Sequence, residues 1–200
     1  MPKLATTFVL GYHGCDTRIA DKVVGGASFT ASRNDYDWLG TGVYFWEANP
    51  VRGLEFAREL RARRRPGAGR VGRPAVVGAV IDLGFCLDLM SSSGLRALKD
   101  AHDDFVSYYR EAGVAAPKNR LGTDLLLRNL DCAVINHLHA IRDAASLTPF
   151  QTVRGVFIEG ERLYEGAGFF AKTHIQICVR DPACIKGVFR VPARDLADAD

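Results

Sequence analysis

Residues 38–46 read Trp-Leu-Gly-Thr-Gly-Val-Tyr-Phe-Trp. Gly40 and Gly42 flank a threonine, and a run of apolar and aromatic residues follows them. A Gly-x-Gly sequence before such a run is typical of a tight turn that leads into a buried strand. The stretch therefore predicts a strand with Tyr44 near its start, and a turn into a core strand is also the simplest explanation of its glycines.

Segments on both sides of this stretch predict a mixture of strands and helices. Further strands are expected at residues 8–12, 76–83, 153–158, 173–179 and 185–191. Helices are expected at residues 51–63 after Asn49-Pro50, at 94–111 after a serine cap, and beyond a cap at Thr123. Residues 25–42 show no sustained period and predict a loop. Because strands and helices do not alternate regularly, the sequence predicts an α+β fold rather than a doubly wound one.

The bulk composition is that of an ordinary globular domain. The 200 residues are 48% apolar and 24% charged, which predicts one domain over residues 1–200. Five cysteines without a Cys-x-x-Cys pair argue against a disulfide framework and a zinc site, so no metal is expected. No apolar run approaches the roughly 20 residues that span a bilayer, and the first residues lack a signal-peptide pattern. The expectation is a cytoplasmic protein without a membrane partner.

Positive charge is concentrated in one segment. Residues 58–73 contain seven arginines and one glutamate, whereas the whole chain has a net charge of only +3. Such a cluster is able to contact phosphate groups through electrostatic attraction that does not depend on sequence. The candidate residues are Arg58, Arg61, Arg63, Arg64 and Arg65. The alternative interpretation is a solvated helix end followed by a loop.

Two further stretches carry candidate chemistry. Residues 11–15 read Gly-Tyr-His-Gly-Cys at the predicted end of the first strand, and residues 173–181 read Thr-His-Ile-Gln-Ile-Cys-Val-Arg-Asp. Taken alone, each has an unremarkable explanation. A histidine at a strand end is most often structural, and a glutamine in an apolar strand faces solvent when its neighbours face the core.

Together and in this order, the three stretches resemble the ADP-ribosyltransferase superfamily, in the branch of the poly(ADP-ribose) polymerases and diphtheria toxin. Tyr12-His13-Gly14 is similar to the family's Trp/Tyr-His-Gly strand end. Residues 40–45 are similar to its Gly-x-Gly-Ile-Tyr-Phe turn and strand, and residues 155–181 to its last loop and catalytic strand. The resemblance implies two small antiparallel sheets in a split β-sandwich with flanking helices. Residues 90–150 have no counterpart in the family's core and form a helical insert.

The resemblance also implies that NAD+ is the co-substrate. His13 would hydrogen-bond the adenosine-side ribose, and the main-chain N–H and C=O of Gly14 would clamp the carboxamide. Tyr44 would stack on the nicotinamide ring. Phe56 is the candidate for a second aromatic wall, and a core residue on the helix at 51–63 is the alternative.

Two positions depart from the family pattern. The catalytic glutamate falls on Gln176, which keeps hydrogen bonding but has no charge and cannot act as a base. Polymer elongation is therefore not expected, whereas transfer of a single ADP-ribose needs basicity from the acceptor or another carboxylate. Glu161 and Glu165 are candidates for that role, and ordinary exposed loop residues are the alternative. The family's carboxamide-binding serine falls on Gly53.

The leading functional hypothesis is an NAD+-dependent mono-ADP-ribosyltransferase, a bacterial-type toxin or effector that modifies a protein or a nucleic acid. A protein of this class implies an antitoxin or immunity partner. Hydrolysis of NAD+ with water as acceptor uses the same residues and is the first alternative. Because Gln176 replaces the glutamate, an inactive module that binds NAD+ or ADP-ribose is the second.

Overall fold

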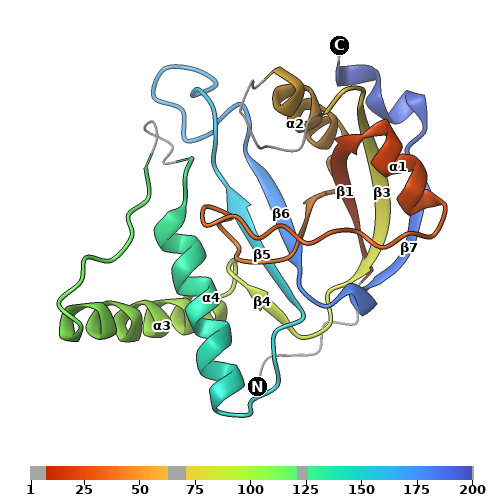
Figure 1. Cartoon of the computed structure of the whole chain (residues 1–200). Helices are drawn as coiled ribbons and strands as arrows, with labels where there is room; N and C mark the ends of the chain where they lie inside the picture. Colours follow the sequence, from red (N-terminus) through yellow and green to blue (C-terminus); the bar gives the residue numbers. More distant parts are fainter. Residues whose placement is uncertain (1–7, 63–70, 121–125, 200) are drawn as a thin grey trace.

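The described part of the chain, residues 8–62, 71–120 and 126–199, folds around one seven-stranded sheet (Figure 1). The structure is a computed structural model of the chain. Its elements are β1 (Phe8–Asp16), α1 (Thr17–Val24), β2 (Val43–Glu47), α2 (Pro50–Ala62), β3 (Pro74–Asp82), β4 (Cys86–Asp88), α3 (Ser92–Glu111), α4 (Asn129–Ala144), β5 (Thr152–Phe157), β6 (His174–Val179) and β7 (Ile185–Arg190). Short 3-10 helices occupy Pro182–Cys184 and Ala193–Ala199. The fold is α+β, as the sequence predicted.

The sheet is mixed, and its order is β4-β5-β6-β2-β1-β3-β7. β4 and β5 are parallel, and every other neighbouring pair is antiparallel. The prediction of two separate antiparallel sheets is therefore wrong for this chain. The two halves are joined because β1 pairs with β2 at two positions, Gly11 with Glu47 and Tyr12 with Trp46.

Helices cover both faces of the sheet. On one face, Leu54 of α2 belongs to the same apolar cluster as Tyr12 of β1. Ile135 of α4 belongs to another cluster with Cys178 of β6, and strand alternation places Tyr12 and Cys178 on this same face. α1 packs on the opposite face through Val23. Figure 1 shows α2 over the β1 half and α3 with α4 beside the β4–β6 half.

Most predicted elements are present, with differences at their ends. Ser91 caps α3 by accepting a hydrogen bond from the Gly94 N–H at 3.0 Å, as expected. β1 does not end at His13-Gly14 but continues to Asp16, because β3 pairs with it along its whole length. α4 begins at Asn129, and the predicted cap at Thr123 lies outside the described residues. α1 and β4 were not predicted.

The predicted helical insert corresponds to the segment between β4 and β5. It carries α3 and α4, which contact each other, and α3 also contacts β4. In the three described ranges of the chain, no helix has both the length and the apolar character needed to cross a bilayer.

Candidate active site

The ladder between β1 and β2 is much shorter than the strands that form it. β1 pairs with β3 from Phe8 to Asp16, but it pairs with β2 only at Gly11 and Tyr12. Beyond Tyr12 both strands continue without pairing to each other. We call this place the strand junction and define it by His13 and Gly14 of β1 together with the facing residues 43–45 of β2.

His13 fills part of the strand junction with its side chain. Its Nδ1 lies 2.8 Å from the main-chain oxygen of Tyr44, so a side-chain hydrogen bond stands where the ladder is missing. A carbonyl oxygen only accepts, so Nδ1 carries the proton and Nε2 presents a lone pair. The ring packs on Phe29 and Phe45, at centroid distances of 5.2 and 5.7 Å. Burial lowers the pKa of His13, which keeps the ring neutral at pH 7.

The main-chain N–H and C=O of Gly14 point towards the strand junction. The Ala48 N–H donates to the Leu10 carbonyl at 2.9 Å, so the polar groups of Leu10 face β2. The direction of these groups alternates along a strand, so the N–H and C=O of Gly14 point to the same edge. The β1–β2 ladder gives them no partner there. On the sheet face, a Cβ at Gly14 would lie 2.0 Å from the Gly53 carbonyl oxygen, so it is α2 that occupies the space of the missing side chain.

Tyr44 is half-buried on β2, and its hydroxyl is used inside the protein. The hydroxyl donates to the Gly40 carbonyl at 2.7 Å and accepts from the Leu39 N–H at 3.0 Å. Burial raises the pKa of Tyr44 well above its usual range, so the hydroxyl stays protonated. Gly40 has a φ of 78°, which favours glycine. The hydroxyl therefore holds the turn that precedes β2, and this explains the glycine motif without a ligand.

We expect Tyr44→Phe to destabilise the folded protein by about 1–3 kcal/mol, because it leaves the Leu39 N–H and the Gly40 carbonyl without their partner. Urea unfolding followed by circular dichroism measures this difference. Tyr108→Phe is the control, since Tyr108 is 65% exposed on α3. Equal stability of the two variants would contradict the structural role of the Tyr44 hydroxyl.

Gln176 lies on β6 directly opposite Trp46 of β2. Residues that face each other in a ladder lie on the same side of the sheet, and so does Tyr44, two residues before Trp46. The Oε1 atom of Gln176 accepts a hydrogen bond from Trp38 Nε1 at 2.6 Å. The side chain is half-buried, so it does not simply point into solvent. Neighbouring strands thus bring Gln176 and Tyr44 to one face.

Phe56 is half-buried on α2, and its ring packs on Trp46 at a centroid distance of 4.8 Å. Trp46 is buried and lies opposite Gln176. Phe56 therefore contacts a core residue at the border of the candidate site. Both interpretations of Phe56, as a core residue and as a wall of the site, agree with this position.

A buried charged cluster that was not predicted joins α2 to the segment that precedes β6. Arg52 is 5% exposed and contacts Glu159 at 3.1 Å and Glu59 at 3.2 Å. Lys172 Nζ lies 2.9 Å from Glu59. Glu159 and Lys172 stand at the two ends of the segment 159–172, so both ends are held against one helix.

Several buried nitrogen atoms next to this cluster have no hydrogen-bond partner among the described residues. They are Trp46 Nε1, His174 Nε2, Arg52 Nε and Arg52 Nη1, and of these Nη1 still forms the ion pair with Glu59 at 3.2 Å. The rings of Trp46 and His174 are 6.2 Å apart, and Arg52 lies 5.9 Å from the Trp46 ring. His174 Nδ1 donates to the Lys172 carbonyl at 2.6 Å, and burial lowers the pKa of His174. This polar group lies on the same sheet face as Gln176, because His174 is two residues before it on β6.

The two carboxylates considered as substitute bases are both exposed. Glu161 and Glu165 lie in the segment before β6. The Glu159 side chain is only 12% exposed, and its charge is paired with Arg52. The structure therefore does not bring Glu161 or Glu165 into a defined contact with Gln176.

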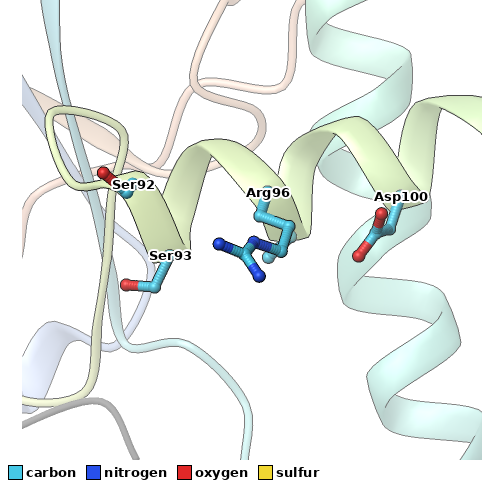
Figure 2. Close-up of a pocket in the computed structure, with 5 residues that line it drawn as sticks. Ser92, Ser93, Arg96 and Asp100 are labelled. Carbon is cyan, nitrogen blue, oxygen red and sulfur yellow. The ribbon is translucent and has the colours of Figure 1, made fainter.

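The arginines considered for phosphate contact are only partly described. Arg58 and Arg61 are exposed near the end of α2, whereas Arg63, Arg64 and Arg65 lie outside the described residues. An open hollow exists elsewhere, along α3, where Arg96 extends between Ser93 and Asp100 (Figure 2). None of the residues that line this hollow belongs to the predicted site.

Comparisons of the chain with protein-family models, with curated proteins and with solved structures found no match. The functional interpretation therefore depends on the motifs and on the geometry around the strand junction. That geometry offers the main-chain groups of Gly14 and, on the face of Tyr44, the side-chain amide of Gln176. Strand alternation places the His13 side chain on the opposite face, where its ring packs on Phe29 and Phe45, so the structure does not bring His13 Nε2 and the Gln176 amide to one face. Trp38, Arg52 and His174 were missed as site residues. Trp38 and His174 had a signal, their places in the stretches 38–46 and 173–181, whereas Arg52 had none.

Proposed function

We propose that the chain is an NAD+-dependent ADP-ribosyltransferase that attaches one ADP-ribose to a macromolecule and releases nicotinamide. The observation that carries the proposal is the strand junction, where His13 and Gly14 face Tyr44 across an interrupted ladder. Gln176 lies on the neighbouring strand and on the face of Tyr44. The three motifs that resemble the family thus fall on the neighbouring strands β1, β2 and β6.

The chemistry calls for groups of this kind. Cleavage of the bond between nicotinamide and ribose develops positive charge on the ribose, and the enzyme has to hold the sugar and the carboxamide while this happens. His13 Nε2 would accept a hydrogen bond from the adenosine-side ribose. The Gly14 N–H and C=O would match the acceptor and donor of the carboxamide. The rings of Tyr44 and Phe56 would border the nicotinamide.

The side-chain amide of Gln176 forms hydrogen bonds but cannot act as a base, and this limits the reactions that the site can catalyse. It would donate a hydrogen bond to a hydroxyl of the nicotinamide-side ribose, and it removes no proton from an acceptor. Glu159 is not a substitute base, because Arg52 neutralises it. A hydroxyl acceptor would therefore pass its proton to a group of its own or to water. These properties favour a single transfer over chain elongation.

In this proposal the acceptor is a macromolecule. The proposal also includes a role as a toxin that an antitoxin or immunity protein binds. Arg58 and Arg61 on α2 are the described residues that favour a nucleic acid. Binding through them would weaken steeply as the salt concentration rises. A protein acceptor would show no such general dependence.

The decisive experiment incubates purified wild-type protein with labelled NAD+ and a cell lysate. Label is followed separately in protein, in nucleic acid and in free ADP-ribose, with His13→Ala as the inactive reference. Label on a macromolecule that disappears with the reference supports the transferase and identifies the class of acceptor. Free ADP-ribose alone would favour a hydrolase, and NAD+ binding without turnover would favour a binding module.

Gln176→Ala should lower transfer about tenfold to a hundredfold, because the hydrogen bond that holds the nicotinamide-side ribose in the reactive position is lost. Gln176→Glu should retain or increase NAD+ hydrolysis, since a carboxylate accepts a hydrogen bond from the ribose hydroxyl and its negative charge stabilises the developing positive charge. Initial rates of nicotinamide release measure both effects. Val156→Ala on β5 is the control, because Val156 is exposed and pairs with Ile175 next to Gln176. Full transfer by a folded Gln176→Ala protein would place the third site residue elsewhere.

A further inference from the structure

The hydrogen bond between Trp38 and Gln176 determines which end of the glutamine amide faces the site. Trp38 Nε1 lies 2.6 Å from Gln176 Oε1. An indole N–H only donates, so it selects the amide oxygen and excludes the amide nitrogen from this contact. The NH2 group is then directed away from Trp38. Among the described residues it has no hydrogen-bond partner, and it is not one of the buried unpaired atoms.

Trp38 is itself held in place on the sheet. Its ring lies 5.0 Å from the ring of Phe157 on β5. A Cβ on Gly155 would lie 3.0 Å from the Trp38 Cη2, so the indole sits directly against the β5 main chain. Gly155 faces Gln176 in the ladder. A flat indole over β5 therefore reaches the amide on β6 only because the residue beneath it is a glycine.

The loop that carries Trp38 is anchored on α4. Asn129 Nδ2 donates to the Asp35 carbonyl at 3.1 Å, and the Thr41 N–H donates to Asn136 Oδ1 at 3.1 Å. These bonds bracket Trp38 on both sides. The helical insert therefore supports the indole, and through it Gln176.

We propose that Trp38 is a positioning residue that fixes the Gln176 amide with its NH2 group towards the substrate ribose. This inference rests on the proposed function and assigns Gln176 the role of a hydrogen-bond donor. Without Trp38, the oxygen and nitrogen ends of the amide exchange places freely, so the NH2 donor is directed towards the ribose for only part of the time. No covalent step passes through Trp38.

The test replaces Trp38 by phenylalanine, which keeps an aromatic ring over Gly155 and removes the N–H donor. We expect kcat for nicotinamide release to fall about tenfold while KM for NAD+ changes little, because the lost orientation matters most in the transition state. In a Gln176→Glu background the same replacement should cost no more than about twofold, since the two oxygens of a carboxylate are equivalent. A purely structural role of Trp38 would lower kcat equally in both backgrounds.

A second measurement does not depend on activity. The chain has two tryptophans, so its 15N spectrum contains two indole resonances, and Trp38→Phe assigns them. The Trp38 indole N–H should exchange slowly with solvent in wild-type protein and faster in Gln176→Ala. Equal exchange in both proteins would overturn the hydrogen bond and the inference with it. If Trp38→Phe does not fold, Trp46→Phe assigns the two indole resonances instead, and the exchange measurement is made in the same way.

The two proposals fail in different ways. Absence of NAD+ turnover by wild-type protein overturns the proposed function, whatever the indole resonance shows. Turnover by wild type together with an unchanged kcat in Trp38→Phe overturns only the role of Trp38. A tenfold loss that Gln176→Glu rescues supports both.

Discussion

His13→Ala protein is expected to consume NAD+ about 100- to 1,000-fold more slowly than wild type while it remains folded. The substitution removes the Nε2 lone pair offered to the ribose. It also removes the Nδ1–H bond to the Tyr44 carbonyl, which is the side-chain contact across the strand junction. Initial rates of NAD+ consumption measure the effect, and circular dichroism at the same temperature verifies the fold.

Two further variants separate these contributions. His13→Asn keeps a short N–H donor for the Tyr44 carbonyl but has no group at the place of Nε2, so it should recover stability and not turnover. His137→Ala is the matched control, because His137 lies on α4 and its Nε2 contacts Asp104 at 2.6 Å. It should consume NAD+ at the wild-type rate. A folded His13→Ala protein with a rate near that of wild type would refute the assignment of His13.

The elements that carry the candidate site were predictable because their signals are local. The Gly-x-Gly turn and the aromatic run after it predict β2, and the structure has β2 at Val43–Glu47. The apolar residues around Gln176 predict β6, which the structure has at His174–Val179. Turn glycines and strand patterns depend on neighbours along the chain, so a single sequence contains them.

Contacts between distant segments were not predictable in the same way. Trp38 and Gln176 are 138 positions apart, and the pairing of β6 with both β2 and β5 brings them together. Arg52 has no local sequence signal of burial, yet it is buried beside Glu59 and Glu159, whose charges balance its own. Such pairings depend on the packed fold, which local propensity does not determine.

The strand junction shows why β1 was predicted too short. At His13 and Gly14, β1 is no longer paired with β2. The apolar run that predicts the strand also ends there. β3 nevertheless pairs with β1 as far as Asp16, whose carboxylate accepts the Gly72 N–H at 2.7 Å. The strand is thus held from one side only. A strand with one paired edge keeps its conformation while the polar groups on its other edge stay unpaired, which is what a main-chain binding site requires.

Gly14→Ala is expected to destabilise the protein by about 2–4 kcal/mol, because the new Cβ overlaps main-chain atoms that have no flexible side chain to move. The Cβ would lie 2.0 Å from the Gly53 carbonyl oxygen and 3.4 Å from the Ala57 nitrogen. α2 would have to move away from β1, and it carries Phe56 and Arg52 with it. Urea unfolding measures the stability, and NAD+ consumption by the folded fraction should fall as well.

Gly187→Ala provides the matched control for this substitution. Gly187 also lies in a strand, β7, but nothing is found within 4 Å of a Cβ placed there. Its replacement should change stability by less than about 1 kcal/mol, in either direction, since only the freedom of the unfolded chain is reduced. If both alanine variants lose stability equally, the cause is the loss of glycine in a strand and not the contact of α2 with β1. If only Gly14→Ala is affected, the close packing of α2 on β1 depends on the missing side chain of Gly14. The main-chain N–H and C=O of the same residue point to the strand junction.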